Sequence, residues 1–238
     1  MGYIFTLGDM LKYTEWSRQP NTASLLHAGL TLCHQMLAPQ PLEAILDIGC
    51  GSCFSLLKLK QMGFMVHGVE ASPDIVDLIR RKHALTDCID VGHACDLPYD
   101  DNSFSYACFF NALEYIDDPS KALAEAFRVA RQKVFIGFFN RYAVSYFRHR
   151  IQGLWTKSFF RHANFFSLWD IKNMVYKTLG PVPIQWQSLA LVPLGETRPN
   201  SQLSKYIPFG AFIGVTVTVN PRFTTNALHL KHECASGV

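Results

Sequence analysis

The chain has 238 residues, of which 49% are hydrophobic and 17% are charged, and its formal net charge is +3. This composition supplies enough apolar side chain for a large core and excludes a disordered chain. We expect no transmembrane span, because no run approaches the ~18 apolar residues that one needs. The net charge is too mild to indicate nucleic-acid binding by itself.

Short apolar runs alternate with helical patterns, which predicts an α/β sheet with helices on both faces. The predicted helices cover residues 22–37, about 53–62, a stretch that starts at Pro73 after Ser72 as N-cap, 119–130 and 167–180. The predicted strands cover residues 44–48, 65–69, 88–91, 105–110, 134–138, 184–192 and 211–219. Because the sequence contains no repeat and no low-complexity linker, we expect residues 1–238 to form one domain.

Cysteine usage points to a reducing compartment. Seven cysteines, an odd number without a framework spacing, predict free thiols. Because no secretory signal opens the chain, we expect a cytoplasmic protein. Cys50 and Cys53 form a CxxC pair, but no second pair completes a zinc set, so we expect no metal. The sequence leaves the oligomeric state open.

The strongest local signal is the strand at 44–48 with the turn Gly49-Cys50-Gly51 after it. Glycines between a parallel strand and a helix N-terminus let a ligand approach bare backbone and free N–H groups. Glu70 ends the next strand, where a carboxylate can accept two hydrogen bonds from a ribose diol. The third glycine of a dinucleotide-binding motif is replaced by Phe54, which argues against NAD and FAD.

Four motifs in register resemble the class I S-adenosylmethionine-dependent methyltransferases. They lie at residues 45–51, 66–73, 94–104 and 110–119, and Tyr13 and Trp16 resemble the lid helix of small-molecule members. The resemblance implies a Rossmann-like seven-stranded mixed sheet in the order 3-2-1-4-5-7-6, with the last strand antiparallel and residues 1–40 as a helical lid. It implies S-adenosylmethionine as cofactor and in-line transfer of its methyl group to a small-molecule acceptor.

The resemblance also implies roles for single residues. Gly49 and Gly51 would admit the methionine part of the cofactor, and Asp47 would fix the turn and reach the amino group through water. Glu70 would hold the ribose, and Asn111 would lie beside the methyl group. The implied cofactor-binding set is Asp47, Gly49, Cys50, Gly51, Glu70, Ala71, His93, Ala94, Asp96 and Asn111, with His93 and Ala94 meeting the adenine edge through their backbone.

The chain departs from the family pattern at three positions. Many relatives carry an acid for the adenine amine at the position of His93, and Asp96 could compensate for its loss. Cys53 replaces a frequent third glycine, and Ser105 replaces a frequent Asp. These departures keep open a second reading, a non-catalytic protein that binds S-adenosylmethionine for regulation.

Charge is segregated along the chain, and this bears on the acceptor. Residues 83–120 contain eight acids and no Lys or Arg, whereas residues 126–169 contain eight bases and no acid. We expect the basic aromatic insertion at 141–167 to cap the cofactor cleft and to select an anionic or aromatic acceptor, with a solvated face as the alternative. The residues that we expect to contact the acceptor are Tyr13, Trp16, Arg148 and Arg161.

Methyl transfer needs a base only when the acceptor is a neutral hydroxyl, a phenol or an acidic carbon. The weak candidates for that base are His149, His162 and Glu114. A nucleic-acid acceptor is not expected, since residues 111–114 lack the Pro-Pro turn of amino-methylating DNA enzymes and no Pro-Cys dipeptide occurs. An RNA-modifying enzyme stays open as an alternative, because the insertion interleaves bases with rings.

Overall fold

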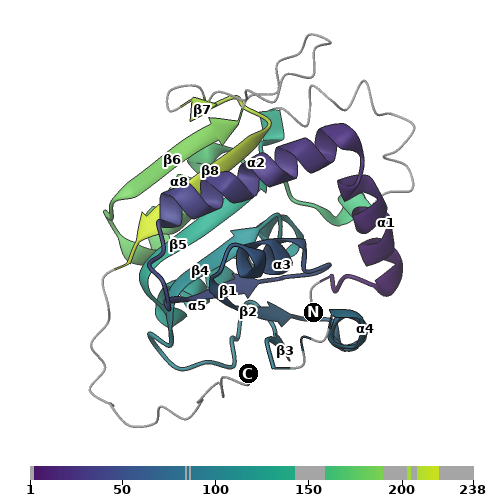
Figure 1. Ribbon diagram of the computed structural model, residues 1–238. Coiled ribbons are helices and arrows are strands. Elements are labelled where there is room, and N and C mark those ends of the chain that lie inside the picture. The colour runs from purple at the N-terminus through teal and green to yellow at the C-terminus, as the bar shows by residue number, and fades with distance from the viewer. Residues whose placement is uncertain are drawn as a thin grey trace.

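The computed structural model describes residues 3–83, 85, 87–142, 159–189, 203–204 and 208–219. Eight strands of this part form one mixed sheet in the order β3-β2-β1-β4-β5-β8-β6-β7 (Figure 1). The strands are β1 (Ala44–Ile48), β2 (Met65–Glu70), β3 (Ile89–Val91), β4 (Phe104–Phe110), β5 (Ala130–Phe139), β6 (Ile184–Leu189), β7 (Leu203–Ser204) and β8 (Phe212–Thr218).

The topology confirms the predicted fold. Strands β1 to β5 pair in parallel, and β8 is antiparallel to both β5 and β6. With β8 as the seventh predicted strand, the order is the expected 3-2-1-4-5-7-6. The two-residue β7 pairs with β6 and extends that edge of the sheet beyond the prediction.

Helices cover both faces of the sheet (Figure 1). They are α1 (Leu7–Ser17), α2 (Pro20–Leu37), α3 (Phe54–Gln61), α4 (Pro73–His83), α5 (Pro119–Val129) and α8 (Leu168–Leu179), with 3-10 turns η1 (Leu113–Tyr115) and η2 (Phe159–His162). Proline opens α2, α4 and α5, where its missing N–H is not needed. None of the helices in the described part of the chain has the length and hydropathy of a membrane span.

Two apolar clusters, one on each face of the sheet, form the core. Along β4, the side chains of Tyr106, Cys108 and Phe110 join the cluster under α1, α2, α3 and α4. Ala107 and Phe109 join the cluster under α5 and α8. Since β4 is covered on both faces, its sequence is a continuous apolar run rather than an alternating one.

The observed β5 differs most from its prediction. It begins at Ala130, directly after α5, whereas the sequence predicts a start at Val134. The polar residues at the start of this strand are typical of a loop, but Lys133 belongs to the strand. Its ammonium donates to the carbonyls of Met36 and Leu37 at 3.3 and 3.0 Å, where α2 ends. Residues 190–192 of the predicted sixth strand lie outside the described residues.

Candidate functional site

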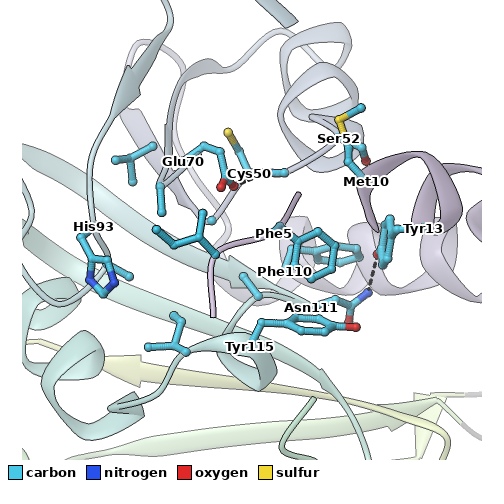
Figure 2. A pocket seen from close by; sticks show the side chains of 18 of the residues that line it. Phe5, Met10, Tyr13, Cys50, Ser52, Glu70, His93, Phe110, Asn111 and Tyr115 are labelled. Carbon is cyan, nitrogen blue, oxygen red and sulfur yellow. Dashed lines mark hydrogen bonds between the residues drawn. The ribbon is translucent and has the colours of Figure 1, made fainter. Parts of the chain in front are cut away.

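A pocket opens at the carboxyl ends of β1, β2 and β4, with the N-terminal segment (residues 3–6) and α1 over it (Figure 2). The order of the strands reverses between β1 and β4, and ligands of open α/β sheets bind at such a switch point. The hollow measures about 970 Å³, including space open to solvent.

The turn between β1 and α3 forms one wall of the pocket. Gly49 and Gly51 have φ angles of +71° and +47°, a left-handed conformation that favours glycine. A Cβ on Gly49 would lie 2.8 Å from the Cβ of Ala112. The N–H groups of Gly49 and Cys50 donate to the carbonyl of Val69 at 2.8 and 3.2 Å, which ties the turn to β2. Bare backbone therefore faces the pocket in a fixed shape.

Glu70 lies at the tip of β2 and presents its carboxylate to the same wall. Its Oε2 accepts the N–H of Gly51 at 3.0 Å, and its Oε1 accepts the N–H of Ser72 at 3.0 Å. Burial raises the pKa of this carboxyl group. Each oxygen retains a second lone pair, so the carboxylate can bind a diol while it holds the turn.

Asp47 lies behind the glycine turn and is not part of the pocket wall. Its carboxylate accepts the hydroxyl of Ser55 at 2.6 Å and the thiol of Cys108 at 3.6 Å. Because it is buried, its pKa is raised to about 6. The structure thus places Asp47 where it joins β1 to α3 and supports the turn from behind.

The loop after β3 brings two of its three candidate residues to the pocket. His93 and Ala94 line it, together with Ala71 after β2, whereas Asp96 does not. Asp96 closes a turn instead, since its N–H donates to the carbonyl of His93 at 2.9 Å. The Nδ1 of His93 accepts the N–H of Cys95 at 3.3 Å, so this side chain helps to shape the loop.

Asn111 and Tyr13 meet across the pocket (Figure 2). Asn111 follows β4 with a φ angle of +53°, and its Nδ2 donates to the hydroxyl of Tyr13 at 3.4 Å. The Oδ1 of Asn111 is buried and has no hydrogen-bond partner among the described residues. Trp16, the other lid candidate, packs on Phe139 and Phe160 rather than lining the pocket. The unpaired acceptor oxygen therefore belongs to a pocket-lining residue that is bonded to Tyr13 through its amide nitrogen.

Glu114 is buried next to the pocket, in η1. Its Oε1 accepts the N–H of Phe139 at 3.0 Å, and its Oε2 has no hydrogen-bond partner. Burial raises the pKa of this carboxyl group to about 7. The side chain is only 1% exposed and does not line the pocket, so a direct contact with an acceptor is not part of this arrangement.

We predict that Glu114→Gln makes the protein more stable at about pH 8 and leaves its stability at about pH 5 nearly unchanged. The folded chain retains a proton on Glu114 that the unfolded chain has lost. The free energy of unfolding of the wild-type protein therefore falls by about 3 kcal/mol in total as pH rises from about 4.5 to 7. Denaturant unfolding at both pH values measures this, with the exposed Glu15→Gln as control. An equal pH dependence in wild type and Glu114→Gln would contradict the prediction.

The candidates of the predicted cap divide into described and undescribed residues. His162 stacks on Tyr3 with ring centroids 3.7 Å apart and an angle of 7° between the rings. Arg161, its neighbour in η2, is exposed, and neither side chain lines the pocket. His149 and Arg148 lie outside the described residues. What the structure shows of residues 159–166 is a contact with the N-terminal segment and α1.

Two of the three departures from the family pattern lie away from the pocket wall. Cys53 is the buried N-cap of α3, and its thiol donates to the sulfur of Cys50 at 3.8 Å. Ser105 lies near the start of β4 and accepts a hydrogen bond from Arg131 at 2.9 Å. In the described part of the chain, no three His, Cys, Asp or Glu side chains gather as a metal-binding group. His93 is the departure that faces the pocket.

The sequence reasoning missed a set of apolar and acidic wall residues. They come from the N-terminal segment, α1, the end of β4 and the stretch after it: Tyr3, Phe5, Met10, Phe110, Tyr115 and Asp117. No motif marks Tyr3, Phe5 and Met10, and the motif at residues 110–119 contains the other three without marking them as wall residues. The path of residues 3–6 over the sheet brings all six together. The alternation of Tyr3 and Phe5 with smaller residues was the available signal.

The middle of the chain is similar to known methyltransferases. Residues 46–137 match the model of a family described as a methyltransferase domain. Norajmaline N-methyltransferase of Rauvolfia serpentina is 34% identical over 94 residues, which are 36% of this chain and 32% of the relative. Demethylmenaquinone methyltransferase of Clavibacter sepedonicus is 33% identical over 97 residues, 40% of each chain. The chain thus matches less than half the length of these curated relatives.

Solved structures extend the match over most of the chain. A methyltransferase from Thermotoga maritima, described as a possible histamine N-methyltransferase, superposes with a TM-score of 0.65 at 23% identity. The superposition covers 87% of this chain and 94% of that one. Magnesium protoporphyrin IX methyltransferase from Synechocystis, solved with bound S-adenosylhomocysteine (SAH), has a TM-score of 0.59 at 13% identity, covering 84% and 85%. At these identities the likeness establishes the fold alone.

Proposed function

We propose, from the class I methyltransferase domain that this chain carries, that it transfers a methyl group from S-adenosylmethionine to an aromatic small molecule. One observation supports this most strongly. The glycine turn and Glu70 form one end of a single pocket, and a wall of aromatic rings forms the other. A donor and an acceptor bound side by side there would need little more than alignment to react.

The residues present fit S-adenosylmethionine. Gly49 and Gly51 leave bare backbone where the methionine part would lie, and Glu70 has free lone pairs for the ribose hydroxyls. Asn111 lines the same pocket at the end of β4, where the resemblance would place it beside the methyl group. When bound, this cofactor supplies a methyl group on a positively charged sulfur, which is electrophilic without further activation.

The other residues would act by position. Ala71, His93 and Ala94 would enclose the adenine through the loop after β3, since all three line that part of the pocket. Asp47 would hold the turn from behind through Ser55 rather than contact the cofactor, because its side chain does not line the pocket. We propose Glu114 as a buried structural carboxyl group next to the pocket, bonded to the N–H of Phe139, and not as a base.

The acceptor class rests on the wall opposite the cofactor. The rings of Tyr3, Phe5 and Tyr115 support an aromatic acceptor. The anionic alternative depended on Arg148 and Arg161; Arg161 is exposed off the wall, and Arg148 lies outside the described residues. The two relatives whose names give norajmaline and demethylmenaquinone as acceptors support a small molecule.

The proposed activity is tested by methyl transfer from S-adenosylmethionine with a radiolabelled methyl group. The full chain is incubated with a library of aromatic small molecules and, separately, with total RNA. We expect label in at least one small molecule, none in RNA, and loss of transfer in Glu70→Gln. Label in RNA would favour the RNA-modifying alternative, and cofactor binding without any transfer would favour a regulatory protein.

We also propose a reducing compartment such as the cytoplasm as the setting of this activity. The six cysteines among the described residues are free thiols, and five of them are buried. Two of these thiols, Cys50 and Cys53, lie in or beside the cofactor turn. A cytosolic redox poise would keep them reduced.

A further inference from the structure

The pocket contains a second wall, apart from the proposed cofactor residues, that we call the acceptor wall. It is made by five rings and one acid: Tyr3, Phe5, Tyr13, Phe110, Tyr115 and Asp117. The rings come from the N-terminal segment, α1, the end of β4 and η1. Figure 2 shows Phe5, Tyr13, Phe110 and Tyr115 around one space, with Asn111 beside Tyr13.

The rings of this wall hold one another in place. Phe5 packs against Tyr115 with centroids 4.7 Å apart at 78°, and Tyr3 packs against Phe5 at 6.1 Å and 74°. Both contacts set the positive edge of one ring against the negative face of another. Tyr3 is in turn stacked on His162. The wall is therefore a fixed aromatic corner, and aromatic faces attract cations within about 6 Å.

Two hydrogen-bond acceptors, on Asp117 and Asn111, also favour a ligand that carries positive charge or N–H groups. The carboxylate of Asp117 lies on the wall, where its Oδ1 accepts the N–H of Tyr3 at 3.4 Å. The Oδ1 of Asn111 is buried in a side chain that is 6% exposed, and it has no donor. An unsatisfied buried acceptor costs about 1–3 kcal/mol unless a ligand supplies a donor. A ligand with N–H groups would satisfy Asn111 and face Asp117.

We infer that the acceptor is an amine on an aromatic body, methylated at nitrogen; the inference rests on the proposed function. The amine first loses a proton to solvent and reacts as the free base. Its nitrogen lone pair forms the N–CH₃ bond while the S–CH₃ bond breaks and leaves its electron pair on sulfur. The positive charge thus passes from sulfur to nitrogen, and the resulting ammonium releases one N–H proton to solvent. Asn111 accepts an N–H of the amine, and the rings and Asp117 stabilise the charge as it moves.

The same wall discriminates against an anionic acceptor. A carboxylate or phenolate would place negative charge next to Asp117 and against the negative faces of the rings. Its reaction would also cancel the positive charge of the sulfonium. The wall would therefore stabilise the transition state less than it stabilises the positively charged cofactor before the reaction. For an amine the charge persists through the reaction, and the wall remains favourable throughout.

Calorimetry with three probes of one size tests this inference: 2-phenylethylamine, 2-phenylethanol and phenylacetate. The full chain is first saturated with SAH, which fills the cofactor half of the pocket and permits no turnover. We expect the amine to bind about tenfold or more tightly than phenylacetate, with the alcohol between them. Phenylacetate binding as tightly as the amine would overturn the inference. A titration in which amine binding does not saturate would also overturn it.

A variant pair separates the wall from the rest of the surface. Asp117→Asn is expected to weaken amine binding about fivefold and to leave the affinity for SAH unchanged. Asp100→Asn, an exposed acid before the other end of β4, is the control and is expected to change neither. Asn111→Asp keeps the acceptor oxygen and tolerates the positive φ angle, so it is expected to retain amine binding.

The failures are distinguishable. If SAH itself does not bind a folded chain, the proposed function is wrong, and this inference is wrong with it. If SAH binds but the amine shows no preference over phenylacetate, the proposed function stands and the amine is wrong. Equal amine affinity in wild type and Asp117→Asn would likewise contradict the role of this wall.

Discussion

Glu70→Gln is expected to weaken S-adenosylmethionine binding by about 1–3 kcal/mol, because charge-assisted hydrogen bonds to the ribose diol are lost. The structure adds a second reason. Both oxygens of Glu70 accept backbone N–H groups, from Gly51 and Ser72. An amide nitrogen in place of either oxygen would set a donor against a donor, so the glycine turn would shift as well. Calorimetric titration with S-adenosylmethionine measures the loss.

The control for this prediction is Glu43→Gln. Glu43 also accepts hydrogen bonds through its carboxylate, among them one from Tyr106 at 2.6 Å, but it precedes β1 and lies away from the pocket. Its substitution is expected to leave cofactor affinity unchanged. The melting temperature of each variant without ligand shows whether the fold is intact. Wild-type affinity in Glu70→Gln would contradict both the contact with the ribose and the support of the turn.

Gly49→Ala is expected to destabilise the fold by about 2–4 kcal/mol and to remove measurable cofactor binding. The left-handed conformation at φ +71° costs a residue with a Cβ about 1–2 kcal/mol. The added Cβ would also lie 2.8 Å from that of Ala112, at which distance one of the two segments must move. Both segments line the pocket, so the movement would change its shape. Denaturant unfolding and calorimetry measure the two effects.

Gly63→Ala separates backbone strain from contact. Gly63 has a φ angle of +89°, and nothing lies within 4 Å of the place where its Cβ would be. This variant is therefore expected to show only the conformational cost, with cofactor affinity unchanged. If Gly49→Ala were no more destabilising than Gly63→Ala and still bound the cofactor, the close approach of the turn to Ala112 would have no consequence.

The cofactor end of the pocket could be predicted because its signals are local. Strand, turn and helix follow one another directly from Ala44 to Gln61, and Glu70 ends the adjacent parallel strand. Parallel pairing with equal register then brings the two tips together, whatever the rest of the chain does. Asp47 shows the limit of this reasoning. The resemblance implied that Asp47 fixes the turn, but its partner Ser55 lies eight residues on, a spacing that no motif marks, so this hydrogen bond could not be predicted.

The acceptor end could not be predicted, because it depends on packing between distant segments. Tyr3 and Tyr115 are far apart in the sequence and reach one wall only when residues 3–6 cross the carboxyl ends of the strands. Propensity and periodicity carry no information about such a crossing.

Part of the charge segregation along the chain has a structural role in the described residues. Arg128 on α5 forms an ion pair with Asp101 just before β4, so this pair of opposite charges fastens α5 to the start of β4.

The central claim is that the glycine turn and Glu70 bind S-adenosylmethionine, and one titration tests it most directly. The full chain, shown to be folded by its cooperative melting, is titrated with S-adenosylmethionine in a calorimeter. The account predicts saturable binding at one site per chain, displaced by SAH and absent in Gly49→Ala. A folded wild-type chain that takes up no S-adenosylmethionine, or that binds it equally well in Gly49→Ala, would contradict the account.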